Sequence, residues 1–191
     1  MKLLREYIRE LLTESAIHPR VMRMIDKAEQ MKLTLKINRY GVALHPPKKG
    51  EIPVASVQWD DDPMYGPCLK SKIVNSTYAD EGLGPLIYDI AIEATGGLTS
   101  DRTQVSDEAE AVWDYYTNYR KDVQVQQLDI DKYNRDNHDQ LTPDNKDDDC
   151  EQLPAVSKYG PNWNDSGLSK KISKVGTPVI DELRKRGMVV E

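Results

Sequence analysis

The residues from Lys70 to Ala94 place the strongest constraint on what this chain can fold into. A run typical of a short β-strand, Leu69 to Asn75, is followed by the glycine turn Gly82-Leu83-Gly84 and then by apolar residues at helical spacing. Pro85 stands where its fixed φ and missing N–H suit a first helical turn, and Gly96-Gly97 ends the pattern. The segment is therefore predicted to form a strand, a tight turn and a helix.

The flanking sequence adds strands before this segment and further elements after it. Alternating apolar and polar residues predict antiparallel strands within residues 33–45 and 52–59. After the turn helix we expect a strand at Leu98–Asp101, a helix at Asp107–Tyr119 capped by Ser106, and a last strand at Val123–Leu128. The expected fold class is α/β (α+β), with a central, mostly antiparallel sheet flanked by helices.

The two ends of the chain have a different character. Residues 1–14, MKLLREYIRELLTE, carry Leu, Ile and Tyr on one helical face, which predicts an amphipathic helix, and a second helix is expected at 20–29. Residues 129–152 contain almost no apolar side chains, so we expect a long polar loop before a closing helix at 177–186. The predicted division is a helical leader (1–30), the sheet domain (31–131), and an irregular C-terminal region (132–191) in which a polar loop and a helix pack on that domain.

Charge and hydropathy exclude some classes of partner. Twenty-six basic and thirty-two acidic side chains give a net charge of −6 over 191 residues, so direct nucleic-acid binding over the whole surface is not expected. The sequence has no apolar run long enough to cross a membrane, and no secretory signal is expected at its start.

Metal and disulfide sites are not expected either. Cys68 and Cys150 stand far apart without ligand spacing, which favours reduced thiols, and the three histidines are scattered. The run Asp144–Glu151 holds five carboxylates that could bind a hard cation, but it lacks the spacing and the glycine of a calcium loop. A solvated acidic loop is the preferred interpretation.

Two segments of the sequence resemble a known family. The order of elements from Leu33 to Asp131 resembles that of the GNAT (Gcn5-related N-acetyltransferase) fold. The stretches SKIVNSTYADEGLGPLIYDIAIEA (71–94) and GLTSDRTQVSDEAEAVWDYY (97–116) are similar to the acetyltransferase-like proteins encoded by large tailed bacteriophages. In GNAT enzymes the glycine turn holds the pyrophosphate of acetyl-coenzyme A. The resemblance thus implies that Gly82, Leu83, Gly84 and the following helix start bind this cofactor; the alternative is a tight turn without a ligand.

Polar residues after the next predicted strand and on the helix that follows are candidates for roles in the reaction. We expect Arg102 to clamp an anion and Asp101 to act as a base or an orienting group, unless the two form an ion pair at the sheet edge. A GNAT tyrosine that protonates the leaving thiolate would correspond to Trp113, which leaves Tyr116 or Tyr115, within one turn, for that role.

Two further features depart from the family pattern or carry no catalytic role. Ala79 replaces the Arg or Gln of the family turn, and the carboxylates of Asp80 and Glu81 would repel a pyrophosphate. Tyr88 and Asp89 are interpreted as a packing residue and a solvent-facing residue.

The resemblance implies a phage-encoded N-acyltransferase that uses acetyl-coenzyme A and an amine acceptor. The alternative is a catalytically inactive fold that serves as a virion structural protein or contacts a host protein. The leader resembles targeting segments of phage internal head proteins, and Leu12-Thr13-Glu14 before Ser15-Ala16 fits their cleavage pattern; an ordinary first helix packed on the sheet or a second subunit is the other interpretation. The implied location is the bacterial host cytoplasm, with packaging in the phage head.

Overall fold

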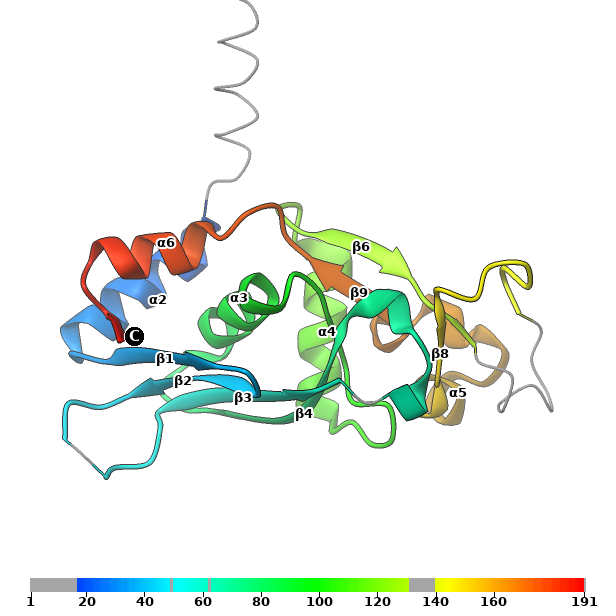
Figure 1. The fold of residues 1–191 in the computed structure, drawn as a ribbon, viewed down its shortest axis with the longest axis horizontal. Helices are drawn as coiled ribbons and strands as arrows, with labels where there is room; N and C mark the ends of the chain where they lie inside the picture. Colours follow the sequence, from blue (N-terminus) through cyan, green and yellow to red (C-terminus); the bar gives the residue numbers. More distant parts are fainter. Residues whose placement is uncertain (1–16, 49, 62, 131–139, 191) are drawn as a thin grey trace, which may run out of the picture.

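An eight-stranded, mostly antiparallel sheet organises this mixed α/β protein, here described from a computed structural model (Figure 1). The structure describes residues 17–48, 50–61, 63–130 and 140–190, so the predicted leader helix and cleavage site lie outside the described residues. The strand order is β10-β1-β2-β3-β4-β5-β9-β6, with parallel pairing at β10–β1 and β4–β5. The strands of this sheet are β1 (Thr34–Asn38), β2 (Gly41–His45), β3 (Ala55–Asp60), β4 (Lys72–Ala79), β5 (Leu98–Thr99), β6 (Gln124–Gln127), β9 (Lys170–Ser173) and β10 (Val189–Val190).

One face of β1–β4 carries the main core. The antiparallel strands predicted within residues 33–45 and 52–59 are present, and burial alternates along β3. Inward side chains of the three strands, such as Leu35, Leu44 and Val57, are fully buried. Helix α3 (Gly84–Thr95) lies on this face, with α2 (Pro19–Gln30) and α6 (Pro178–Lys185) beside it (Figure 1). The helices predicted at 20–29, 85–94 and 177–186 are thereby confirmed to within two residues.

The second half of the sheet begins at β5. Helix α4 (Asp107–Tyr119) follows it as predicted, with Ser106 Oγ accepting the N–H of Ala109 at 3.3 Å, and packs near β9 and the short 3₁₀ turn η5 (Gly167–Ser169). The prediction that Val123–Leu128 is the last strand is wrong. Ile172 of β9 pairs with both Leu98 of β5 and Val125 of β6, so a C-terminal strand fills the centre of this half-sheet.

The polar region 129–152 also contributes to the interior, contrary to the expectation of a solvated loop. Strands β7 (Asp129–Ile130) and β8 (Asp149–Cys150) form a separate parallel pair in which Ile130 and Cys150 are fully buried. Helix α5 (Leu153–Tyr159) follows directly. A single apolar residue per strand gives no alternation, which is why sequence patterning did not detect this pair.

The expectation of two reduced thiols is wrong in this structure. Cys68 and Cys150 form a disulfide across a sequence separation of 82 residues, with an S–S distance of 2.08 Å. Cys68 lies on the short turn η2 (Cys68–Lys70) immediately before β4, and Cys150 lies on β8. Their spacing carries no recognisable pattern because the fold alone brings the two segments together.

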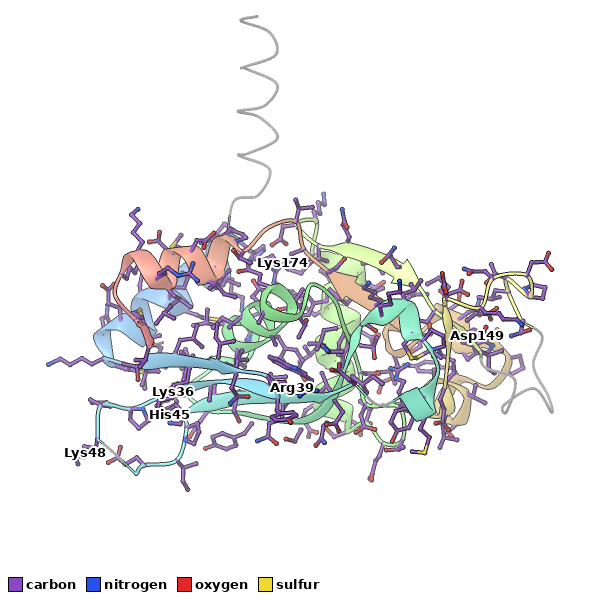
Figure 2. The ribbon with its side chains drawn as sticks, in the orientation of Figure 1. Lys36, Arg39, His45, Lys48, Asp149 and Lys174 are labelled. Atoms are coloured by element: carbon purple, nitrogen blue, oxygen red, sulfur yellow. A yellow bond between two sulfur atoms is a disulfide. The ribbon has the colours of Figure 1, made fainter. Side chains whose placement is uncertain are left out.

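A buried network of charges joins the helices. Asp89 of α3 is fully buried, not solvent-facing as expected, and receives two hydrogen bonds from Arg120 at 3.0 and 2.9 Å. Lys174, which follows β9 and lies over α3 (Figure 2), pairs with Glu93 at 2.7 Å and with Asp89 at 3.5 Å. Glu93 in turn accepts the first N–H groups of α6. Buried charges of this kind are tolerated because each has a partner.

Among the described helices, none combines the length and the apolar character needed to cross a lipid bilayer.

Candidate functional site

Strands β4 and β5 part soon after they meet. They share two residue pairs, Lys72 with Leu98 and Ile73 with Thr99, and no described strand pairs with this edge of β4 beyond Ile73. The other edge of β4 stays paired with β3 through Ala79, with a register shift at Gln58/Trp59 that inserts one extra residue in β4. A bulge of this type bends and twists its strand. The second half of β4 therefore has one open edge.

The backbone of this open edge carries polar groups that pair with no described strand. Asp80 donates its N–H to Val54 O at 2.9 Å, on the β3 side. Because successive residues of a strand point their N–H and C=O groups to opposite sides, Thr77 and Ala79 turn theirs away from β3, toward the gap. The gap is thus bordered by alternating donors and acceptors that an extended ligand could pair with.

The side chains of β4 also show that the gap is open to solvent. Thr77 pairs with Val57 and Ala79 pairs with Ala55, so each shares the helix-covered face with a fully buried partner. Thr77 and Ala79 are nevertheless exposed. Helix α3 covers β3 but leaves this part of β4 accessible, and Tyr88 of α3 borders it, with its hydroxyl 3.1 Å from Thr77 Oγ1.

The accessible part of β4 around Thr77 and Ala79 is called the open strip below. The glycine turn stands at its end. Glu81 and Gly82 both have positive φ, 55° and 71°, and the N–H of Leu83 closes the turn on Asp80 O at 3.0 Å. Helix α3 begins at Gly84, where an added Cβ would come within 3.8 Å of the Ala79 Cβ and no other atom closer than 4 Å. Backbone N–H groups at a helix start attract anions, so this end of the strip suits a phosphate group.

The acidic residues of the turn are partly neutralised. Lys27 of α2 donates its Nζ to Glu81 Oε2 at 2.9 Å and to Glu81 O at 2.6 Å. Asp80 Oδ1 accepts the N–H of Glu81 at 2.7 Å, which fixes the turn. The repulsion expected from two free carboxylates is therefore reduced by a lysine that the turn sequence alone does not reveal.

Tyr116 is not placed at the open strip. It is 1% exposed, and its hydroxyl lies 2.6 Å from Asp89 Oδ1 and 3.1 Å from Pro85 O. Burial and the charge of Asp89 raise the pKa of Tyr116 well above its ordinary value, although Arg120 opposes the shift. This side chain serves the buried network and has no open path to a leaving thiolate.

Trp113 and Tyr115 occupy different settings on the same helix. Trp113 is buried against Tyr88 in an edge-to-face contact, with ring centroids 6.1 Å apart. Tyr115 is partly buried and stacks on Tyr119, with Arg20 of α2 above its ring.

Asp101 and Arg102 hold the loop after β5. Asp101 Oδ1 accepts the N–H of Thr103 at 2.6 Å and that of Gln104 at 3.0 Å, as in an Asx turn. Arg102 is 1% exposed and donates to the carbonyls of Ser100, Glu151 and Leu168 and to the Ser100 hydroxyl. The two side chains form no direct ion pair, and the structure gives Arg102 a bracing role in place of an accessible anion clamp. Burial lowers its pKa to about 10, against the raising effect of Asp101 and Glu151.

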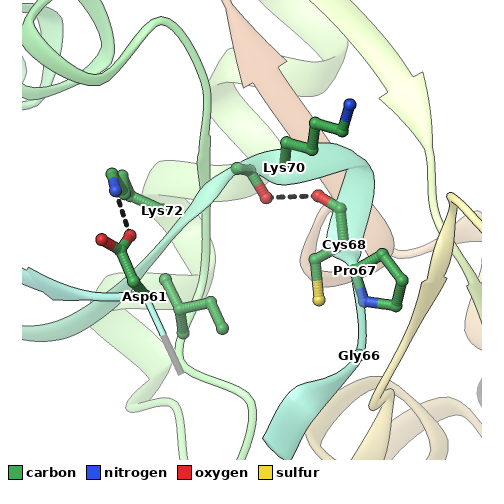
Figure 3. Close-up of a pocket in the computed structure, with 8 residues that line it drawn as sticks. Asp61, Gly66, Pro67, Cys68, Lys70 and Lys72 are labelled. Carbon is green, nitrogen blue, oxygen red and sulfur yellow. Dashed lines mark hydrogen bonds and ion pairs between the residues drawn. The ribbon is translucent and has the colours of Figure 1, made fainter. Parts of the chain in front are cut away.

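A separate hollow of about 320 Å³ lies at the other end of β4 (Figure 3). Several of its lining side chains already have partners, because Lys72 Nζ contacts Asp61 Oδ1, and Ser71 Oγ donates to Cys68 O at 2.6 Å. The gap beside Thr77 offers backbone groups and a helix start instead.

Sequence patterns identified part of this arrangement. They located Gly82, Leu83 and Gly84 at a strand-to-helix turn, and the structure keeps these residues together. They missed Thr77, Tyr88 and Lys27, since the exposure of an inward-facing Thr and a contact between helix and turn depend on tertiary structure. No protein-family model matches this chain, and no curated protein or solved structure is significantly similar to it.

Proposed function

We propose that this protein is a GNAT-like acyl-coenzyme A-binding protein that transfers the acyl group to an amine. The divergence of β4 and β5 after two residue pairs is the observation that supports the proposal most. A GNAT fold admits the pantetheine arm of the cofactor through a gap of this kind. The pantetheine would run along β4 from Ala79 toward the bulge, with its pyrophosphate at the glycine turn.

Each part of the cofactor would meet a chemically suitable surface. The two amides of pantetheine can pair with the N–H and C=O groups of Thr77 and Ala79, as an added strand does. The pyrophosphate would accept hydrogen bonds from the N–H groups at the start of α3, beside Lys27. The Thr77 hydroxyl, which contacts Tyr88, lies between these two regions.

The reaction would be a direct transfer. A neutral amine attacks the thioester carbonyl, a C–N bond forms, and the C–S bond breaks as the coenzyme A thiolate leaves. Backbone N–H groups of β4 would stabilise the developing oxyanion, and the nitrogen's extra proton would pass to water. The product is an amide.

A second candidate, cofactor binding without turnover, is favoured by the position of Tyr116. Its buried hydroxyl, bound to Asp89, is unsuited to protonate a thiolate. In that case the GNAT-like fold would act as a virion structural or host-interaction protein.

Titration calorimetry with acetyl-coenzyme A tests cofactor binding. We expect saturable binding to the full chain that Thr77→Trp reduces at least tenfold, because the larger side chain fills the strip. Ser76→Trp is the matched control: Ser76 is exposed on the opposite face, where it contacts Gln58, and this variant should bind normally. No binding at millimolar cofactor, or equal losses in both variants, would refute the proposal.

Measuring the release of coenzyme A thiol with a panel of amines distinguishes the two candidate functions. Turnover in the intact protein that survives Tyr116→Phe supports transfer without this acid. Binding without any thiol release supports the second candidate.

A further inference from the structure

Three aspartates converge where the short strands β7 and β8 pair. Asp129 lies opposite Asp149 in the parallel register, and Asp148 directly precedes β8. One carboxylate oxygen of each residue lies within 4.8 Å of one from each of the others. Figure 2 labels Asp149, the first residue of β8. Asp129 stands 19 positions before Asp148 in the sequence, and the pairing of β7 with β8 brings it beside Asp148 and Asp149.

Asp148 lacks the hydrogen bonds that its burial requires. The residue is 8% exposed, and its Oδ1 is buried with no hydrogen-bond partner among the described residues. Its Oδ2 lies 2.9 Å from the Thr142 hydroxyl, which is also 3.2 Å from Asp129 Oδ2. A hydroxyl has one proton, so it can satisfy only one of these two oxygens at a time. A buried carboxylate oxygen left in this state is costly.

Asp129 is held rigidly in the same cluster. It is 1% exposed, and its oxygens accept the N–H groups of Ile130, Leu141 and Thr142 at 2.7, 2.9 and 2.9 Å. Neither Asp129 nor Asp148 takes part in a salt bridge with any described residue. Two buried carboxylates are thus close together without a compensating cation from the described chain, a situation in which like charges repel strongly.

We propose that Asp129, Asp148 and Asp149 bind a hard divalent cation, Ca²⁺, at the β7–β8 junction. The donor set consists of carboxylate oxygens, which Ca²⁺ and Mg²⁺ prefer and which zinc sites rarely use alone. Ca²⁺ suits the cluster better than Mg²⁺, because it accepts irregular geometry and completes its shell with water. The ion would bond the unpartnered oxygen of Asp148 and offset the charges of the two buried residues, Asp129 and Asp148.

The binding would stabilise a region with little regular secondary structure. Strands β7 and β8 are two residues each, and the next residue after Asp149 is the disulfide-bonded Cys150. This site does not depend on the proposed cofactor site, which lies on β4 and α3, so either can fail without the other.

Calorimetry with CaCl₂ on the chelator-treated full chain tests the site directly. We expect saturable binding of one ion and, at about 100 times the dissociation constant, a rise in melting temperature of about 5 °C or more. Mg²⁺ should bind at least tenfold more weakly. Absence of saturable Ca²⁺ binding at concentrations up to about 10 mM, or binding of Mg²⁺ alone, would overturn the assignment.

A pair of matched variants locates the ion. Asp148→Asn should weaken Ca²⁺ binding at least tenfold and abolish the thermal shift. Asp144→Asn, in the same acidic run but exposed and outside the cluster, should keep both. In EDTA, Asp148→Asn should melt no lower than the wild type, because it removes an uncompensated charge. Equal losses of binding in the two variants, or a melting temperature lowered by Asp148→Asn as much in EDTA as in Ca²⁺, would show that the cluster is structural only.

Discussion

Single charged residues decide how well the glycine turn can accept an anion. Glu81 and Lys27 are both about half exposed and form a direct ion pair beside the start of α3. The lysine can turn either to the glutamate or to a bound phosphate. Affinity for an anionic ligand should therefore respond to each of the two charges.

Glu81→Gln should tighten the binding of acetyl-coenzyme A about three- to tenfold at low salt, since one negative charge near the pyrophosphate is removed and Lys27 is released. Effects of about 1 kcal/mol are typical for exposed charges a few ångströms apart, and they fade as salt is added. Calorimetry at two salt concentrations measures this. Glu51→Gln, which alters an exposed glutamate paired with Lys48, is the control and should leave the affinity unchanged. A weaker affinity in Glu81→Gln would contradict the placement of the pyrophosphate at the turn.

Asp122 provides a pH-dependent test of the buried network. Burial tends to raise its pKa, but hydrogen bonds and attraction from Arg120 outweigh this and lower the pKa below the ordinary 3.8. A carboxyl whose pKa is lower in the folded state stabilises the fold above the unfolded pKa, and this contribution is lost as pH falls through the folded pKa.

Asp122→Asn should accordingly reduce the free energy of unfolding at pH 7 by about 1 kcal/mol, a usual value for a partly exposed ion pair with hydrogen bonds. The difference from the wild type should shrink as the pH falls below 3.8. Urea unfolding curves between pH 3 and pH 7 measure it. A difference that stays constant over this range would mean that the charge of Asp122 is not involved.

At the scale of elements, the sequence predicts what local periodicity encodes. Helix α4 is predicted at its observed bounds because Ser106 caps it and acidic residues fill its first turn. The glycine turn and α3 are predicted because Pro85 and Gly96 punctuate them. The open edge of β4 could not be predicted, since it depends on where β5 diverges from β4.

The elements that were missed are short or have no distinctive pattern. Strands β7, β8 and β10 have two residues each, too few to show a period. Lys170–Ser173 is flanked by polar residues, and its place between β5 and β6 arises from tertiary pairing. Asp89 was misassigned to the surface because a charged residue is rarely fully buried unless paired, and its partner Arg120 is 31 residues away.

Helix α6 depends on a cap supplied by another helix. Glu93 of α3 accepts the N–H of Val179 at 3.1 Å and that of Ile180 at 2.9 Å, whereas Thr177 makes no side-chain cap. Glu93→Gln keeps the shape but removes the charge that both the helix start and Lys174 contact. We expect a loss of about 1–3 kcal/mol in unfolding free energy, with faster amide exchange in α6 and β10. Glu182→Gln, near the other end of α6, serves as the comparison, and equal effects on exchange would contradict the capping role.

At the scale of the whole molecule, the disulfide joins two regions that are far apart in the sequence, beside backbone hydrogen bonds from Leu69 N–H to Asp147 O at 2.7 Å and from Glu151 N–H to Tyr65 O at 2.9 Å. It closes a loop across 82 residues, from the turn before β4 to β8. A loop of this size is worth about 4.5 kcal/mol in the chain-entropy model, an upper value for real proteins. A reducing cytosol would keep both cysteines in the thiol form, so the disulfide is expected to form fully under oxidising conditions.

The double variant Cys68→Ala/Cys150→Ala should therefore unfold at lower urea concentration than the oxidised wild type. The reduced wild type should fall close to the variant, because both lack the bridge. Urea titrations with and without a reducing agent, alongside thiol counting, measure this. Two reactive thiols in the native protein without reductant, or no change in unfolding midpoint, would contradict the assigned bridge.

The two residue pairs between β4 and β5 have a mechanical consequence. Five strands lie on one side of this seam and three on the other, and the backbone hydrogen bonds that cross the seam are confined to its first few ångströms. Because so few hydrogen bonds join the two half-sheets, we expect the junction at Lys72 and Ile73 to be the part of the sheet that deforms most easily. A ligand bound along Thr77 and Ala79 would restrict movement of the two half-sheets relative to each other. Binding at one edge of one strand would then make the whole sheet more rigid.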